Sequence, residues 1–173
     1  MKSDHTHHEE LERIRKLIEG IEFAMLTTEE DDGHLRSRPM ATLQLDGDGA
    51  LWFFTGAGSH KMEEIGHHRQ VNLAYMDKGR DRYVSISGRA ELVRDRAKIE
   101  ELWNPIYKAW FPEGLNDPDL ALLKVSVERA EYWDPVSSKV TQALGFVKAL
   151  VTRQRAEPDG HGKFALDEQH PAH

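Results

Sequence analysis

Hydrophobic residues recur at helical spacing near the start of this chain and alternate at strand spacing through its middle. Residues 7–20 carry apolar side chains three or four positions apart, at Leu11, Ile14, Leu17 and Ile18. That spacing predicts a helix, and Gly20 marks its end. From Val84 to Leu92 every second residue is apolar or small. This alternation predicts a strand with one buried face.

Five more apolar runs, bounded by turn residues, predict further strands. They cover residues 21–28, 35–45, 50–55, 71–76 and 122–133. The strongest turn is Asp46-Gly47-Asp48-Gly49, because glycine accepts positive φ and aspartate caps its own turn. Strands joined by short turns favour an antiparallel sheet closed into a barrel over a doubly wound parallel sheet. Helical stretches over 60–67 and 96–106 flank the strands.

The two ends of the chain differ in composition from this strand-rich part. Residues 9–136 form the one predicted domain. Residues 1–8 are polar, so we expect a disordered N-terminus. A weak amphipathic pattern predicts a C-terminal helix over 137–151. Residues 152–173 mix proline, glycine, histidine and charge, which is typical of a disordered tail.

Composition and charge narrow the function classes. The 173 residues carry 23 Lys+Arg against 30 Asp+Glu, a formal net charge of -7. Such a chain holds nucleic acid poorly, because affinity for phosphate backbones depends on counterions that cationic side chains displace. The absence of cysteine excludes disulfides and thiol nucleophiles. No apolar run approaches the ~20 residues that span a bilayer. We expect a cytoplasmic protein without nucleic-acid or membrane partners.

A candidate anion site begins on the strand predicted over 35–45. Arg36 and Arg38 lie two residues apart, so they point to the same face of an extended strand. Pro39 has no amide hydrogen, which places this strand at an edge or bulge of the sheet. Guanidinium groups match the fork geometry of phosphate oxygens. Taken alone, either arginine is better explained as a solvated surface residue.

The second half of this site follows the next strand. A turn at Gly56-Ala57-Gly58 leads to Ser59, a helix N-cap candidate, and to Lys61 in the first helical turn. A helix start offers unpaired amides and a positive dipole to an anion. Thr55 adds a hydroxyl at the strand end. These groups predict a phosphate receptor, and the aromatic run Trp52-Phe53-Phe54 beside it suggests a flat ligand such as a flavin nucleotide.

Several motifs in order resemble one known family. They are Ser37-Arg38-Pro39-Met40, Trp52-Phe53-Phe54-Thr55, Gly58-Ser59-His60-Lys61, Tyr83-Val84-Ser85-Ile86-Ser87-Gly88, Ala109-Trp110-Phe111-Pro112 and Ala130-Glu131-Tyr132-Trp133-Asp134. The stretch from about residue 7 to residue 150 resembles the FMN-binding split β-barrel family related to pyridoxamine 5'-phosphate oxidase. More narrowly, it is similar to the bacterial general stress protein branch of that family.

The resemblance implies a mainly β fold with flanking helices, a six-stranded antiparallel split barrel. It also implies a homodimer with one FMN in each of two interfacial grooves. In that family pattern Arg38, Ser59 and Lys61 would hold the FMN phosphate, with Thr55 and His60 near it.

Other positions carry the rest of the flavin site in the resemblance. The backbone of Pro39 and Met40, together with the strand of Phe54, would line the ring system and the ribityl chain. Tyr83 matches a polar strand residue near the flavin. Trp133 would close the site or the dimer interface, with a core aromatic as the equal alternative.

Catalysis is where the chain departs from the family's oxidases. Those enzymes hold the pyridoxal substrate with a C-terminal segment that residues 137–151 do not match, so oxidation of vitamin B6 phosphates is not expected. We expect an FMN-dependent oxidoreductase with a small-molecule electron donor or acceptor, and assign no catalytic residue. The alternatives are a non-catalytic flavin binder or stress sensor, and a barrel that holds a deazaflavin cofactor or haem.

The histidines do not by themselves predict a metal site. Many of the ten lie near the ends of the chain, at His5, His7, His8, His161, His170 and His173. A metal site needs ligands fixed by a second layer of contacts. The sequence therefore gives no expectation of a resident metal.

Overall fold

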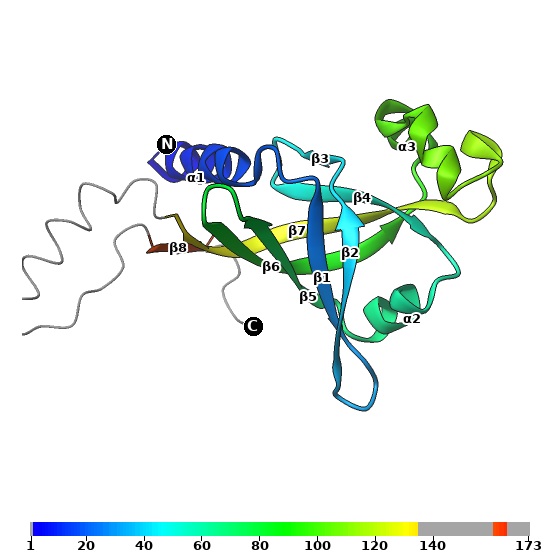
Figure 1. Cartoon of the computed structure of the whole chain (residues 1–173), viewed down its shortest axis with the longest axis horizontal. Helices are drawn as coiled ribbons and strands as arrows, with labels where there is room; N and C mark the ends of the chain where they lie inside the picture. The colour runs from blue at the N-terminus through cyan, green and yellow to red at the C-terminus, as the bar shows by residue number, and fades with distance from the viewer. Residues whose placement is uncertain (1, 135–160, 166–173) are drawn as a thin grey trace, which may run out of the picture. The chain divides into compact units, whose positions relative to one another are not determined.

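The computed structural model describes residues 2–134 and 161–165, which form a mainly β fold with short helices (Figure 1). The helices are α1 (Lys2–Ile18), α2 (His60–His67), α3 (Arg96–Leu102) and the 3-10 helices η1 (Pro105–Ala109) and η2 (Gly114–Asn116). The strands are β1 (Phe23–Glu29), β2 (Leu35–Ala41), β3 (Gln44–Leu45), β4 (Ala50–Gly56), β5 (Gln70–Asp77), β6 (Arg82–Val93), β7 (Leu120–Trp133) and β8 (His161–Ala165). Within the described residues, no helix has the length and apolar character needed to cross a membrane.

The strands form one sheet in the hydrogen-bonded order β2-β1-β5-β6-β7-β4-β3, and β8 pairs with β7. The pairs β1–β2, β3–β4, β4–β7 and β7–β8 are antiparallel. β2 lies at the edge of the sheet, as Pro39 predicted. The register of β1 and β2 places Arg38 opposite Leu26 and Arg36 opposite Thr28.

Contacts divide the chain into two compact units. The first contains Met1–Ile21, Ala74–Ile86 and Arg129–His173, and the second contains Glu22–Leu73 and Ser87–Glu128.

In the first unit, an arginine on β6 connects α1 to the strands. Arg82 donates hydrogen bonds to the carbonyls of Lys16 and Leu17 at 3.1 and 3.2 Å, and forms an ion pair with Asp134 at 3.4 Å. These bonds satisfy carbonyls in the last turn of α1 that have no partner within the helix.

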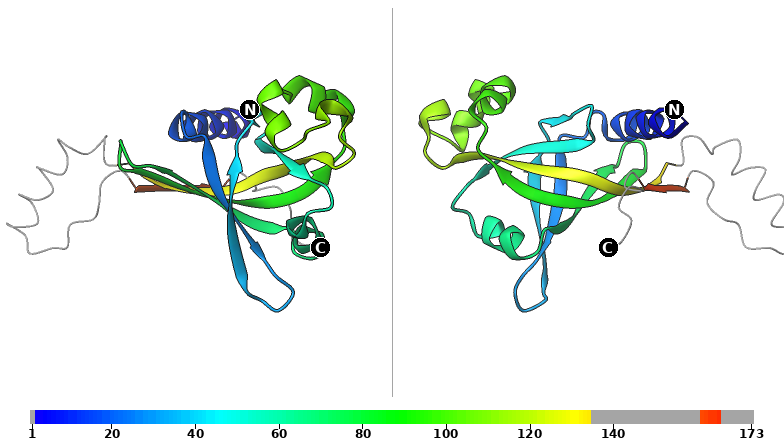
Figure 2. Two further views of the ribbon diagram at one scale, coloured as in Figure 1. Left: turned by 45° about the vertical axis from the view of Figure 1, so that its right-hand side comes forward. Right: turned by 180° about the vertical axis from the view of Figure 1, so that it is seen from behind.

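The second unit contains a core built from β4, β7 and the helical segment between β6 and β7. Its buried members are Ala50, Trp52, Ile99, Phe111, Leu120 and Leu122. Figure 2 shows α3 and the helical turns after it gathered at one end of β4 and β7. The ring of Phe54 meets the rings of Trp103 and Tyr107 edge to face, at centroid distances of 5.6 and 5.0 Å. Burial of these rings fixes the helical segment on the strands.

Some predicted boundaries were wrong. α1 begins at Lys2 rather than near residue 7, because polar residues at a helix start leave no hydrophobic period to detect. The strand expected over 35–45 is divided into β2 and β3. The helix expected over 96–106 ends at Leu102, since Asn104 caps a new 3-10 helix by accepting a hydrogen bond from the Ile106 amide at 3.0 Å.

The tail prediction was wrong for residues 161–165, which form β8. This strand gains its conformation from pairing with β7, a contact that local composition does not reveal. Lys163 adds an ion pair to Glu131 at 2.9 Å. With β3 and β8 the sheet has more strands than the six expected. The helix predicted over 137–151 lies outside the described residues.

Candidate functional site

The turn between β4 and α2 is shaped by a residue far along the chain. The Gly58 amide donates a hydrogen bond to the Asp119 carboxylate at 2.8 Å, and the Ala57 amide donates to the Asp119 carbonyl at 2.8 Å. The same carboxylate leaves no space for a Cβ at Gly56. The Ser59 amide donates to the Gly56 carbonyl at 3.1 Å. The turn amides expected to face an anion are therefore used, at these three positions, to build the turn.

Side chains, in contrast, gather beside this turn in a pocket of about 360 Å³, here called the cation pocket. Its lining residues are Arg36, Ser37, Arg38, Ser59, His60, Lys61 and Glu64. The Lys61 ammonium donates a hydrogen bond to the Ser59 hydroxyl at 2.9 Å, and that hydroxyl makes no capping bond to α2. The fold thus brings Arg38, Ser59, His60 and Lys61 together from an edge strand and a helix start.

A buried carboxylate that the sequence analysis missed holds Arg38 in place. Glu64 is only 4% exposed and pairs with the Arg38 guanidinium at 2.9 Å, while the Arg38 side chain is 19% exposed. Thr28 lies between them, accepting a hydrogen bond from Arg38 and donating one to Glu64. Such a bonded set fixes the guanidinium direction and leaves part of it facing the pocket.

The charges in this pocket perturb each other. Burial lowers the pKa of Lys61, and repulsion from Arg38 lowers it further, while Asp119 and Glu64 act in the opposite direction. Burial alone would raise the pKa of Glu64, but hydrogen bonds from Thr28 and Arg38, with the Arg38 charge, bring it below its usual value. A bound anion would act on Lys61 in the same direction as the carboxylates of Asp119 and Glu64 and raise its pKa.

A larger cavity of about 410 Å³, here called the aromatic cavity, adjoins the same lysine. Its lining residues are Phe23, Pro39, Met40, Ala41, Leu43, Phe54, Thr55, Gly56, Lys61, Tyr107, Trp110, Phe111 and Asp119. Lys61 is thus shared by the two pockets. Of the predicted residues, Pro39, Met40, Phe54 and Thr55 line this cavity.

Four aromatic residues of the cavity, Phe23, Tyr107, Trp110 and Phe111, were not predicted as site residues. Tyr107 lies in η1, Trp110 and Phe111 directly follow it, and Trp110 remains 64% exposed. Burial, followed by the charge of Glu22, raises the pKa of Tyr107, so its phenol stays neutral and able to donate a hydrogen bond. The Ala109-Trp110-Phe111-Pro112 motif was the sequence feature that could have indicated Trp110 and Phe111. Aromatic residues in a loop are, however, equally well explained by packing in the hydrophobic core.

Two predicted site residues line neither pocket. Tyr83 on β6 and Trp133 at the end of β7 belong to the first unit, and they are 43% and 38% exposed. Their roles in ligand binding stay predictions.

Comparison with known proteins gives the family. The profile of the family described as "Pyridoxamine 5'-phosphate oxidase like" matches residues 9–158. A crystal structure related to general stress protein 26, from Clostridium acetobutylicum, is 21% identical, with a TM-score of 0.68 and coverage of 93% of this chain and 97% of that one. The protein bli-3 of Neurospora crassa is 27% identical over 144 residues, covering 78% of this chain and 69% of its own length.

A closer match in sequence is the general stress FMN/FAD binding protein of Xanthomonas citri. It is 37% identical, with a TM-score of 0.62 and coverage of 73% of this chain and 89% of that chain. The fold expected from the sequence is thereby confirmed. The chain belongs to the pyridoxamine 5'-phosphate oxidase-like family, in the branch of the general stress proteins.

Proposed function

We propose that this chain binds FMN, with the phosphate in the cation pocket and the ring system in the aromatic cavity. The observation that carries the proposal is Lys61, which lines both pockets and so joins an anion receptor to an apolar one. The Xanthomonas citri relative, named an FMN/FAD binding protein, supports a flavin as the ligand class.

The charges of the cation pocket suit the phosphate group of FMN. Arg38 and Lys61 repel one another, and the pKa of Lys61 is lowered in the free protein. A phosphate monoester dianion would relieve that repulsion by accepting charge-assisted hydrogen bonds from both cations and from Ser59. Because Glu64 already pairs with Arg38, the second cation and the hydroxyl are needed to hold a doubly charged group.

The residues also fit in shape and polarity. Phe54, Tyr107, Trp110 and Phe111 supply the aromatic walls of a cavity whose volume lies in the range of about 300–1,000 Å³ usual for small-molecule sites. The neutral Tyr107 phenol offers a hydrogen-bond donor, and Trp110 stands exposed where it can cover a bound ring from water.

The proposed activity is electron or hydride exchange with a small molecule. A bound flavin supplies the redox chemistry, and the chain orients the ring, limits water and tunes the potential through nearby donors. We further propose that the chain acts as a homodimer. Phe23, which lines the aromatic cavity and is half exposed, would then be covered by the second copy. Tyr83 and Trp133 are proposed to contact the flavin or this interface.

The decisive experiment compares FMN with riboflavin, which lacks only the phosphate, and with FAD, whose phosphate is joined to an adenylate group. Apoprotein is titrated with FMN, riboflavin and FAD while flavin fluorescence is followed. We expect FMN to bind at least about 100-fold more tightly than riboflavin, because the lost bonds are charge-assisted and worth about 1.5–3 kcal/mol each. Equal affinity for FMN and riboflavin would contradict the phosphate assignment.

Turnover then separates an enzyme from a binding protein. Holoprotein is mixed with NADH or NADPH under anaerobic conditions and the flavin absorbance is recorded before an acceptor is added. Reduction followed by reoxidation with turnover supports the oxidoreductase. A flavin that stays oxidised with every donor supports a sensor or storage role.

A further inference from the structure

Next to the cation pocket lies a second hollow, here called the acidic pocket, which shares His60 and Glu64 with it. It has a volume of about 820 Å³ and is lined by Glu30, Asp31, Asp32, His60, Glu63, Glu64, Gly66 and His67. Carboxylates and imidazoles dominate its walls, and neither lysine nor arginine is among these lining residues. Oxygen and imidazole nitrogen donors of this kind are suited to a metal ion.

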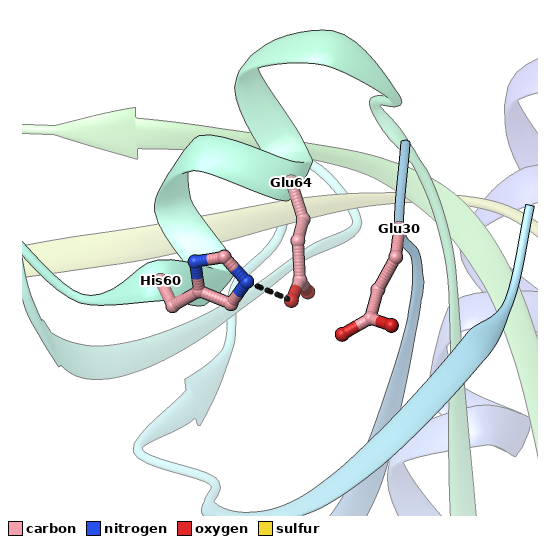
Figure 3. Close-up of side chains that lie close together, drawn as sticks. All are labelled: Glu30, His60 and Glu64. Atoms are coloured by element: carbon pink, nitrogen blue, oxygen red, sulfur yellow. Dashed lines mark ion pairs between the residues drawn. The ribbon is translucent and has the colours of Figure 1, made fainter. Parts of the chain in front are cut away.

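Three of these side chains converge at one point. The carboxylate of Glu30, just after β1, faces His60 and Glu64 on α2 (Figure 3). One ligand atom from each residue lies within 4.8 Å of the other two. His60 and Glu64 are four residues apart, so they occupy the same face of the helix.

His60 is already oriented as metal-binding histidines commonly are. Its Nδ1 lies 3.0 Å from a carboxylate oxygen of Glu63, which leaves Nε2 directed toward Glu64 Oε1 at 3.7 Å. That second distance is too long for a hydrogen bond. A carboxylate bonded to one ring nitrogen fixes the tautomer that presents the other nitrogen to a metal.

Glu64 supplies an independent observation. Its side chain is almost fully buried, and its Oε2 accepts the bonds from Arg38 and Thr28. Its Oε1 is buried and accepts no hydrogen bond among the described residues. A buried carboxylate oxygen without a donor is costly. This oxygen points into the cluster with Glu30 and His60, where a cation would satisfy it.

We propose that Glu30, His60 and Glu64 bind a divalent transition-metal ion at the inner wall of the acidic pocket. One nitrogen and two carboxylate oxygens suit Mn²⁺, Fe²⁺ or Zn²⁺, and three protein ligands leave coordination positions for water from the pocket. Glu30 leaves its ion pair with Arg36, now at 3.3 Å, to complete the site. Local sequence patterns do not predict this site, because Glu30 and Glu64 meet only in the fold.

The proposal does not depend on flavin binding. His60 and Glu64 also line the cation pocket, but Glu30 lines only the acidic pocket of the two. A change at Glu30 therefore tests the metal site with Arg38, Ser59 and Lys61 unchanged, and it affects the cation pocket only through the ion pair of Glu30 with Arg36.

The experiment titrates the full chain with Mn²⁺ and follows the six-line paramagnetic resonance signal of the free ion. Mn²⁺ is the better probe because its preference for oxygen ligands disfavours the histidines near the chain ends. We expect Glu30→Gln and His60→Gln each to weaken Mn²⁺ binding by at least about tenfold, as the loss of supporting residues alone costs 10–100-fold. The matched control is Asp32→Asn, which removes a charge from the same pocket outside the cluster and should leave the affinity within about threefold.

Three results would overturn the proposal. They are the absence of saturable Mn²⁺ binding to the wild-type chain, unchanged binding in folded Glu30→Gln and His60→Gln proteins, and an equal loss in Asp32→Asn, which would show a diffuse charge effect. Circular dichroism establishes that each variant is folded. FMN affinity of Glu30→Gln, measured in parallel, keeps the metal result separate from the proposed flavin function.

Discussion

The cation pocket and the acidic pocket are opposite in charge although they share His60 and Glu64. The cation pocket presents Arg36, Arg38 and Lys61, whereas the acidic pocket has only acids, imidazoles and a glycine on its walls. A chain with a net charge of -7 thus keeps a local cluster of cationic side chains. Local arrangement, rather than the overall field, decides what this protein can bind.

Glu64 separates the two environments. One of its carboxylate oxygens faces Arg38 and Thr28, and the other faces His60. A single buried residue therefore stabilises the cationic side and gives the acidic side its inner wall. The contrast shows that a buried ion pair beside a pocket has two roles. It stabilises the fold, and it determines the net charge that the pocket presents to a ligand.

The largest expected effect comes from removing both cations. Lys61→Ala with Arg38→Ala should weaken FMN binding by about 10²- to 10⁴-fold, since two charge-assisted contacts worth about 1.5–3 kcal/mol each are lost. Removing Arg38 alone would leave Glu64 buried without its counter-charge. The variant therefore also carries Glu64→Gln.

The matched control for this variant is Glu64→Gln alone, which keeps both cations. Fluorescence titration measures FMN affinity in each protein. If Glu64→Gln and the variant that also lacks both cations bind FMN with comparable affinity, the phosphate does not bind in the cation pocket. The proposed difference in ligand preference between the two pockets would then be wrong.

An intermediate effect is expected on stability. Glu64→Ala should lower the free energy of unfolding by about 2–3 kcal/mol, less than the 3–5 kcal/mol of a fully buried pair because Arg38 keeps some solvent contact. Because the folded-state pKa of Glu64 is lowered, its contribution is present above the unfolded pKa and disappears as pH falls through the folded one.

Urea unfolding of the wild type and of Glu64→Ala, repeated at neutral and acidic pH, measures both parts of this prediction. The difference between the proteins should shrink in acid. A difference that stays constant with pH would mean that packing, rather than charge, is what Glu64 contributes.

The smallest expected effect is a proton taken up with the ligand. Burial and Arg38 lower the pKa of Lys61 in the free protein, and a dianion beside it would raise that pKa again. Binding should then consume a fraction of a proton between the two pKa values, and affinity should fall as pH rises through that window.

Calorimetry in buffers of different ionisation enthalpy measures this uptake. Working above about pH 8 keeps the flavin phosphate fully ionised, since its second pKa lies near 6. Lys61→Met provides the reference without the amine. Identical proton uptake in that variant would show that another group titrates.

Sequence patterns predicted the parts of this molecule that depend on neighbours in the chain. The strand alternation, the helix after Ser59 and the edge position of Pro39 follow from local rules of spacing and backbone chemistry. The gathering of Arg38, Ser59 and Lys61 was also accessible, because each lies at a predictable point of a strand or helix.

Other parts depend on contacts between distant segments. Thr28 and Glu64 look like ordinary strand and helix residues until the fold brings them to Arg38. Likewise, β8 is a strand only through its pairing with β7. Trp110 carries no periodic signal, since it follows a 3-10 turn, and its place in the cavity wall depends on how the η1 segment packs on β4.

The hydrogen bond between the Gly58 amide and Asp119 has a consequence for how the protein is made. The two residues are 61 positions apart, and the bond helps to form the turn that presents Ser59 and Lys61. A nascent chain still lacking Asp119 has both of these residues but cannot complete that turn. The proposed anion site should therefore form late in synthesis, once the start of β7 has left the ribosome.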